Sequence, residues 1–320
     1  MRAVWMKEFG PPEVLVADDA PDPVAGEGQV VVEVAFANIT FVETQVRAGA
    51  FPSPTGAAGL PIIPGNGVGG IIRSAGPGVD QALVGKRVVT GTGGSGGYAE
   101  HVAVDAAGVV EVPEGVPMDD AVALLADGRT ATALCRAAEP RPGERVLVEA
   151  AGGGVGTLLV QLAREASTTV VAAAGGARKL DLARELGAEI TVDYGAPDWT
   201  DRVRDAVGGV DVVFDGVGGA LGRAAFDLLA PGGRMFSFGI AAGSFPDVDD
   251  EEAARREVTI TRGVPVSPEQ ARELTASALA RAAEGRLRPV IGQRFPLAEA
   301  AKAHAAIENR ATLGKTLLVP

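Results

Sequence analysis

The chain has 320 residues, a length that suggests two domains. Its formal net charge of −12 and its pI of about 4.8 argue against nucleic acids and anionic membranes as partners. No apolar run reaches the ~18 residues of a membrane-spanning helix. Residues 1–8 are typical of a first strand and not of a signal peptide, and a single cysteine, Cys135, excludes an internal disulfide framework. We therefore expect a cytoplasmic protein.

Residues 1–115 are expected to form a mostly β module, because short β-rich runs alternate with Pro/Gly turns and no long helical period interrupts them. The expected strands are residues 2–5, 14–18, 30–37, 69–74, 87–90 and 98–104. Residues 263–320 are expected to return to this module as a discontinuous first domain, with helices at 268–284 and 296–309 and a strand at 315–319.

Residues 116–262 alternate between apolar strands and helices of about ten residues, which predicts a parallel sheet covered on both faces. The expected strands are 146–148, 168–174, 189–192, 210–215 and 234–238, and the expected helices are 156–166, 180–186, 198–207 and 221–229. The predicted fold class is α/β, with a doubly wound Rossmann sheet inserted into a mostly-β domain.

A glycine-rich turn joins strand 146–148 to helix 156–166. It reads A-x-G-x-x-G, with Ala151, Gly153 and Gly156 at the three fixed places. Gly153 lets the backbone approach a pyrophosphate, Gly156 lets the helix pack close to the strand, and the helix N-terminus presents free N–H groups to the phosphates. We interpret the turn as a dinucleotide site, and a purely structural turn is the alternative.

The end of strand 168–174 indicates which dinucleotide is bound. An NAD enzyme carries Asp or Glu there for the ribose 2′-hydroxyl, whereas this chain has Ala174, followed by Arg178 and Lys179. A carboxylate would repel a 2′-phosphate, while small and cationic residues accommodate it, so the pattern favours NADPH. Alternatively, Arg178 and Lys179 only begin the next helix on its solvated face.

The sequence argues against a metal site. A catalytic zinc needs three Cys, His or acidic ligands and a structural zinc usually four Cys, but the chain has one Cys and two His. We expect Cys135 to be a buried, inert thiol in a helix, and His101 and His304 to be structural or exposed to solvent.

Several motifs, in order, resemble the zinc-independent medium-chain dehydrogenases/reductases, and most closely their quinone oxidoreductase branch. They are GEGQVVVEV at residues 26–34, VETQVRAG at 42–49, PGNGVGG at 64–70, GGYAE at 96–100, DGRTA at 127–131, the glycine turn, and ENRATLGK at 308–315. The resemblance runs nearly end to end. It implies a GroES-like catalytic domain, a Rossmann domain, NADPH and a homodimer paired through an edge strand, for which residues 258–264 are apolar enough.

The resemblance also implies a set of cofactor contacts, carried over position by position. Those expected at the pyrophosphate are Gly153, Val155 and Gly156, and those expected around the 2′-phosphate are Gly176, Lys179 and Tyr194. Those expected at the nicotinamide and its ribose are Thr130, Phe238, Gly239 and Ile240, and those expected to close over the cofactor are Arg262, Gly314 and Lys315. For Tyr194, packing at a strand end is the alternative.

The chain departs from the family pattern where relatives face the substrate. Thr40 stands where Asn is common, Gln45 stands where Tyr is common, and Asp127 and Arg129 flank Gly128 where neutral residues are usual. Arg129 would either bind an anionic or carbonyl-rich substrate or belong to an exposed Asp/Arg pair at a helix start. These departures leave the cofactor prediction unchanged and affect the choice of substrate.

We predict NADPH-dependent reduction of quinones or α,β-unsaturated carbonyls without zinc, because hydride addition to a conjugated acceptor spreads the developing charge. Thr40 is the expected hydrogen-bond donor to the developing oxyanion, with Arg129 or Gln45 as alternates, and the proton could come from water. The alternatives are a pathway-specific enoyl reductase or cyclase of secondary metabolism, and a protein that binds NADPH without turnover.

Overall fold

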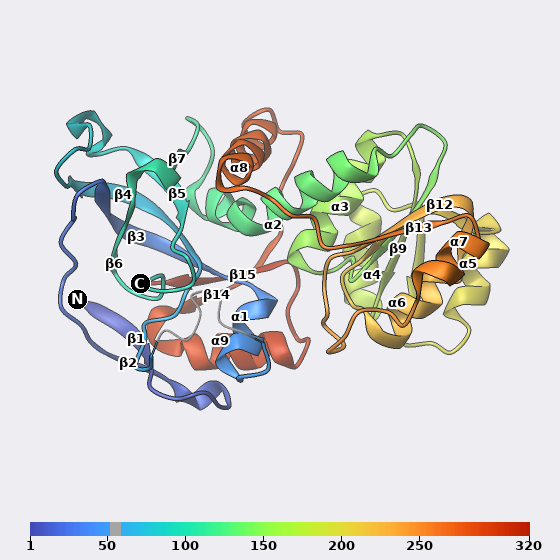
Figure 1. The fold of residues 1–320 in the computed structure, drawn as a ribbon, viewed down its shortest axis with the longest axis horizontal. Coiled ribbons are helices and arrows are strands. Elements are labelled where there is room, and N and C mark those ends of the chain that lie inside the picture. Colours follow the sequence, from blue (N-terminus) through green and yellow to red (C-terminus); the bar gives the residue numbers. More distant parts are fainter. Residues whose placement is uncertain (52–58) are drawn as a thin grey trace. The chain divides into compact units, whose positions relative to one another are not determined.

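The computed structural model describes residues 1–51 and 59–320. They form two compact units, Met1–Arg129 with Pro268–Pro320, and Thr130–Ser267 (Figure 1). The expected boundaries lie elsewhere, at residues 115/116 and 262/263. Helix α2 (Met118–Ala138) contains the first junction between the units, because residues 129 and 130 lie in its middle.

The first unit is built on a largely antiparallel sheet to which both ends of the chain contribute. In the described residues its order is β14-β15-β3-β4-β5-β7, with β6 paired to β3. These strands are β3 (Gln29–Ile39), β4 (Gly67–Ala75), β5 (Arg87–Gly91), β6 (His101–Asp105), β7 (Val110–Glu111), β14 (Ile291–Pro296) and β15 (Lys315–Val319). A separate antiparallel ribbon joins β1 (Arg2–Met6) to β2 (Leu15–Asp19).

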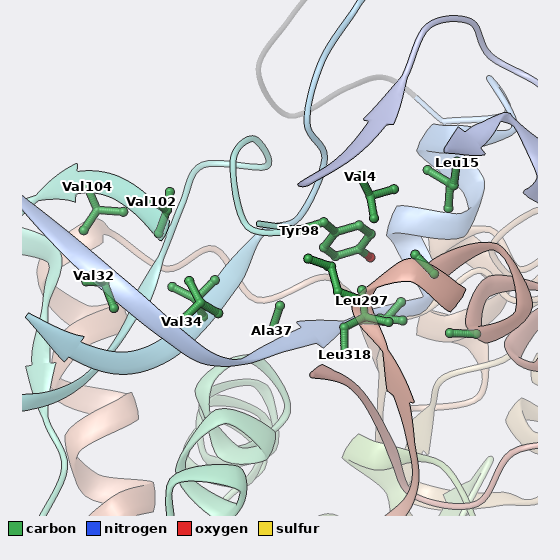
Figure 2. Close-up of a cluster of buried hydrophobic side chains, with 14 of the residues drawn as sticks. Val4, Leu15, Val32, Val34, Ala37, Tyr98, Val102, Val104, Leu297 and Leu318 are labelled. Carbon is green, nitrogen blue, oxygen red and sulfur yellow. The ribbon is translucent and has the colours of Figure 1, made fainter. Parts of the chain in front are cut away.

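The core of the first unit follows from the alternation of apolar residues along these strands. Val32 and Val34 of β3 and Val102 of β6 are buried in one cluster, together with the ring of Tyr98 and Leu318 of β15 (Figure 2). Helices α1 (Phe41–Arg47), α8 (Pro268–Ala283) and α9 (Ala300–Glu308) complete the unit. The polar end of Tyr98 therefore lies inside an apolar environment and needs partners there.

The second unit contains a parallel sheet with the order β10-β9-β8-β11-β12-β13. Its strands are β8 (Arg145–Glu149), β9 (Thr169–Ala174), β10 (Ile190–Asp193), β11 (Val210–Asp215), β12 (Leu229–Ser237) and β13 (Thr259–Arg262). Its helices are α3 (Gly154–Glu165), α4 (Ala177–Glu185), α5 (Trp199–Val207), α6 (Gly219–Phe226) and α7 (Asp250–Arg255). The order reverses between β8 and β11, so right-handed crossovers place helices on both faces and open a crevice at this reversal.

The predicted fold class is confirmed, and strands 210–215 and 315–319 have the expected bounds. Two predicted helices are wrong at one end. The helix expected over 221–229 ends at Phe226, because β12 begins at Leu229 and runs through residues 231–233 with a register shift against β11. The helix expected over 296–309 begins only at Ala300, because residues 291–296 pair with β15. The short helices α1 and α7 were not predicted.

Candidate functional site

The glycine turn between β8 and α3 is the strongest candidate for a binding site in the second unit. Gly153 is the N-cap of the 12-residue helix α3. A Cβ added to Gly156 would stand 2.3 Å from the carbonyl oxygen of Ala150, so only glycine fits there. Gly153 and Val155 are partly exposed, and the N–H groups of a first helical turn have no intrahelical acceptor. This geometry suits a pyrophosphate.

The three residues expected around a 2′-phosphate lie close to this turn. A Cβ on Gly152 would stand 2.6 Å from the side chain of Lys179, so the lysine stem crosses the glycine turn. A Cβ on Gly175 would stand 3.4 Å from the ring of Tyr194. Gly176, with φ of 87°, is the N-cap of α4. These residues therefore lie near the carboxyl end of β9, and their contact with a 2′-phosphate stays a prediction.

An acidic residue that the sequence analysis missed lies in the same corner. Asp193 ends β10, and its carboxylate accepts hydrogen bonds from the N–H of Gly176 at 3.2 Å and of Gly195 at 2.8 Å. It comes from the neighbouring strand, so a search for an acid at the end of β9 does not find it. Asp193 supports the backbone that carries Gly176, and its charge opposes that of Lys179.

Phe238, Gly239 and Ile240 follow β12 and lie beside the end of β11. The N–H of Phe238 donates to the carbonyl oxygen of Asp215 at 2.8 Å. A Cβ on Gly239 would stand 2.3 Å from the carbonyl oxygen of Gly216, which brings the two chain segments into contact. All three predicted residues are partly exposed near the strand-order reversal, where open α/β sheets bind ligands.

Two fully buried carboxyl groups end the strands on either side of this reversal, Glu149 on β8 and Asp215 on β11. Asp215 accepts hydrogen bonds from the N–H of Val217 at 2.8 Å, the N–H of Gly218 at 2.7 Å and the hydroxyl of Ser237 at 2.5 Å. Neither carboxyl oxygen of Glu149 finds a donor among the described residues, and Asp215 lies close enough to influence the pKa of Glu149. Burial, and then the charge of Asp215, raise the pKa of Glu149 well above its usual range.

The residues expected to close over the cofactor already have protein partners. The guanidinium of Arg262 donates to the carbonyl of Val248 and lies 3.4 Å from Asp250. In the first unit, the ammonium of Lys315 donates to Asp127 at 3.0 Å in a buried ion pair. Gly314 has φ of 54° and passes close to β14. Contacts of these residues with a cofactor stay predictions.

The alternative of an exposed Asp127/Arg129 pair at a helix start is wrong. Both residues lie in the middle of α2, and Asp127 is buried and paired with Lys315. The partly buried guanidinium of Arg129 has no hydrogen-bond or ion-pair partner in the described part of the chain, and residues 52–58 hold no Asp or Glu. Thr130 follows Arg129 and is partly exposed.

Thr40, the expected donor to substrate, is the N-cap of α1 and is engaged there. The carboxylate of Glu43 accepts from the Thr40 N–H at 2.7 Å, and the Thr40 hydroxyl lies 2.9 Å from the same oxygen. The amide of Asn66 donates to the Thr40 hydroxyl oxygen at 3.0 Å. Whether the Thr40 hydroxyl can donate to a substrate therefore depends on the protonation of Glu43. Glu43 was not among the predicted site residues. Gln45, in the same helix, is partly exposed.

Glu43 belongs to a buried polar network that crosses the core of the first unit. Its carboxyl also accepts the N–H of Asn66 at 3.1 Å and is hydrogen-bonded to Tyr98, whose hydroxyl lies 2.9 Å from Nε2 of His304. Burial raises the pKa of Glu43, against its hydrogen bonds and the charge of Lys315. Burial, and then Arg47, lower the pKa of His304 to about 3, so its imidazole is neutral. His304 is thus structural, as expected.

Cys135 and His101, the two other residues of types that bind zinc, are less buried than His304. Cys135 was expected to be buried but is only partly so, in α2, and His101 is partly buried in β6. Among the described residues, no group of three or more His, Cys, Asp and Glu could hold a metal ion. No helix of the described residues is long and apolar enough to cross a membrane.

Comparison with known proteins gives matches over the whole chain. The family described as alcohol dehydrogenase GroES-like domain matches residues 26–114, and that described as zinc-binding dehydrogenase matches residues 186–318. The quinone oxidoreductase of Pseudomonas aeruginosa is 32% identical, and a 2-haloacrylate reductase of a Burkholderia species 31%, each over 100% of this chain and 99% of the relative. The structure of Escherichia coli quinone oxidoreductase complexed with NADPH is 28% identical, with a TM-score of 0.91 and complete coverage of both chains.

We expect replacement of Glu149 by glutamine to remove part of the pH dependence of the free energy of unfolding. A carboxyl with a raised pKa in the folded protein keeps a proton that the unfolded chain releases above about 4.3, so stability falls as pH rises. Glu149→Gln cannot titrate and still donates to Asp215. Its stability relative to wild type should therefore increase from about pH 5 to about pH 8, by up to about 1.4 kcal/mol per pH unit.

Urea denaturation at the two pH values measures this difference. Glu144→Gln is the matched control, because a hydrogen bond from Arg234 lowers the pKa of Glu144 and its titration is complete below this range. If Glu149→Gln changes the free energy of unfolding by the same amount at both pH values, Glu149 is ionised in the folded protein.

Proposed function

Because the chain belongs to the quinone oxidoreductase branch of the medium-chain dehydrogenases/reductases, we propose that it reduces quinones or α,β-unsaturated carbonyl compounds with NADPH. The observation that carries this proposal is the corner in which Lys179 crosses the glycine turn at Gly152. Relatives support it, since the solved E. coli quinone oxidoreductase is complexed with NADPH. An enzyme of this branch is favoured over a protein that binds NADPH without turnover.

The chain's own residues would supply position and hydrogen bonds, while NADPH supplies the hydride. The turn from Gly153 to Gly156 would hold the pyrophosphate, and Phe238 and Gly239 would border the nicotinamide at the strand-order reversal. A conjugated acceptor needs less polarisation than an isolated carbonyl, because its negative charge spreads over several atoms. Oriented donors then complete the catalysis.

We propose that the reaction does not use zinc, although one matching family is described as zinc-binding. The support is the ligand inventory, one Cys and two His, of which His304 is bound to Tyr98. A catalytic zinc site requires three such ligands or carboxylates converging on one point.

A second substrate class is favoured by Arg129. Its partly buried, unpaired guanidinium suits a carboxylate, and the Burkholderia relative is a reductase of 2-haloacrylate, a conjugated carboxylate. Reduction of an anionic acrylate or of a pathway-specific enoyl acid is therefore the alternative to a neutral quinone.

The purified protein should oxidise NADPH in the presence of a quinone or a conjugated enone, and prolonged dialysis against a chelator should leave the rate unchanged. The rate is followed by absorbance of NADPH with a panel that pairs each neutral enone with its carboxylate analogue. Arg129→Leu should lower kcat/KM only for the carboxylates, by about 10-fold or more, since a charged hydrogen bond contributes about 1.5–3 kcal/mol. Loss of all activity on chelation, restored by zinc, would contradict the zinc-free proposal.

NADPH should bind at least about tenfold more tightly than NADH, a difference of about 1.4 kcal/mol. Lys179→Ala should remove much of this preference, because it deletes a charge-assisted contact with the 2′-phosphate. Asp193→Asn is the matched variant, and it should increase the preference by removing the opposing charge beside Gly176. Fluorescence titration gives the dissociation constants, and equal values for the two cofactors in the wild type would refute the proposal.

We propose a homodimer that pairs through β13. This strand forms the edge of the parallel sheet, where unpaired backbone groups can bind a second strand. Light scattering should give about twice the chain mass of 32.4 kDa. Ile260→Lys should shift the protein toward the monomer by placing a charge on this edge, whereas Val84→Lys, at an exposed position of the first unit, should not. A monomer at micromolar concentration would contradict the proposal.

A further inference from the structure

The hydroxyl of Thr40 has two fixed neighbours, and their protonation decides where its own proton points. Asn66 donates to the hydroxyl oxygen at 3.0 Å, and Oε2 of Glu43 lies 2.9 Å from that oxygen. A hydroxyl has one proton and two lone pairs. While Glu43 is ionised, the Thr40 proton is donated to it. Once Glu43 carries a proton, Asn66 and Glu43 fill both lone pairs, and the Thr40 proton is free to point toward solvent or substrate.

The surroundings of Glu43 favour its protonated state. Burial is the main cause of its raised pKa, opposed by hydrogen bonds from Thr40 and by the charge of Lys315 on β15. From the other sides it faces the neutral phenol of Tyr98, itself bound to neutral His304 on α9. Arg47 of α1 is paired with Glu308, so its charge is partly neutralised. Glu43 therefore keeps its proton up to a higher pH than an ordinary glutamate would.

A small cavity lies beside Glu43. Its volume is about 30 Å³, and its lining includes Glu43, Asn66, Arg47 and His304. A cavity of this size holds one or two water molecules, since one water needs about 10–15 Å³. Three buried polar atoms have no partner among the described residues, Oδ1 of Asn66, Nε of Arg47 and Nδ1 of His304. A water molecule in the cavity would lie beside Glu43.

We propose that Glu43 stores the proton consumed in the reaction and delivers it through the hydroxyl of Thr40 to the oxygen of the substrate, an inference that rests on the proposed reductase function. The substrate gains a hydride, with its two electrons, from NADPH and becomes an oxyanion. The O–H bond of Thr40 breaks as its proton passes to that oxyanion. The O–H bond of Glu43 breaks as Thr40 is reprotonated, and Glu43 recovers a proton from solvent through the cavity. The acceptor is reduced, and one proton is consumed per hydride.

Four variants test the relay by the pH dependence of kcat. Wild type and Thr40→Ser, which keeps the hydroxyl, should both lose rate as pH rises through the pKa of Glu43.

Glu43→Gln keeps a hydrogen-bond donor to Thr40 but has no proton to deliver. Its kcat should fall by about 10²-fold or more, the usual contribution of general acid catalysis, and should lose the alkaline decline. Thr40→Val should be equally slow and independent of pH, with its NADPH affinity within about twofold of wild type. Glu43→Asp keeps a transferable proton, so its kcat should show part of the alkaline decline that Glu43→Gln loses.

A measurement without turnover separates the relay from the proposed function. Carbon-13 NMR of the Glu43 carboxyl in the resting protein, assigned with Glu43→Gln, should show a pKa above the ordinary value in wild type and Thr40→Ser. If the wild type reduces no acceptor, the proposed function fails, and the NMR titration still decides whether Glu43 holds a proton for Thr40. A titration at or below the ordinary glutamate value, or a Glu43→Gln variant with the wild-type pH profile, would overturn the relay. Thr40→Val also removes the cap of α1, at a cost of about 1 kcal/mol, so its fold is verified by circular dichroism.

Discussion

The binding edge of the second unit depends on one steric constraint, the close passage of α3 over the end of β8. A side chain at Gly156 would meet the carbonyl oxygen of Ala150 at 2.3 Å, so the helix can approach the strand only through a glycine. This approach sets the open N–H groups of the first helical turn at the edge of the sheet, beside the side chain of Lys179. The proposed phosphate binding and the proposed choice between two dinucleotides would thus follow from a backbone contact made by neighbouring residues.

Each unit holds a carboxyl group whose pKa is raised by burial, and the two groups have different hydrogen-bond partners. Glu149 finds no donor among the described residues, so its protonated form is favoured beside Asp215, while Asp215 holds the turn after β11 by accepting from two N–H groups. Glu43 instead receives the N–H groups of Thr40 and Asn66, which stabilise its ionised form and oppose the effect of burial. The first carboxyl is therefore fixed as a neutral structural group, and the second lies closer to the balance at which a proton can be exchanged.

Local patterns were enough to predict the glycine turn, the strand Val210–Asp215 and the place of Lys179 after β9, because each depends on residues within one or two neighbouring β–α units. Tyr194 was expected from the family resemblance. The network around Glu43 was missed because its members come from four separate segments, and the bond between Tyr98 and His304 spans 206 residues. A pair of Asp127 with the nearby Arg129 was one of two alternatives, whereas the partner of Asp127 is Lys315, 188 residues away. Sequence spacing predicts neighbours along one element, but not pairs created by the return of the chain to its first unit.

The departure at Thr40 has a physical meaning in this arrangement. Relatives commonly carry asparagine there, whose amide has two N–H donors and can bond to Glu43 and to a substrate at the same time. Threonine has a single proton, which can serve only one of them. Its availability is therefore set by the protonation of Glu43, to which it lies at 2.9 Å, and by the bond from Asn66 that fills its second lone pair. In the proposed relay, the substitution would convert a permanent donor into one whose direction depends on a neighbouring acid, so that donation to the substrate and delivery of a proton would be linked in one hydroxyl group.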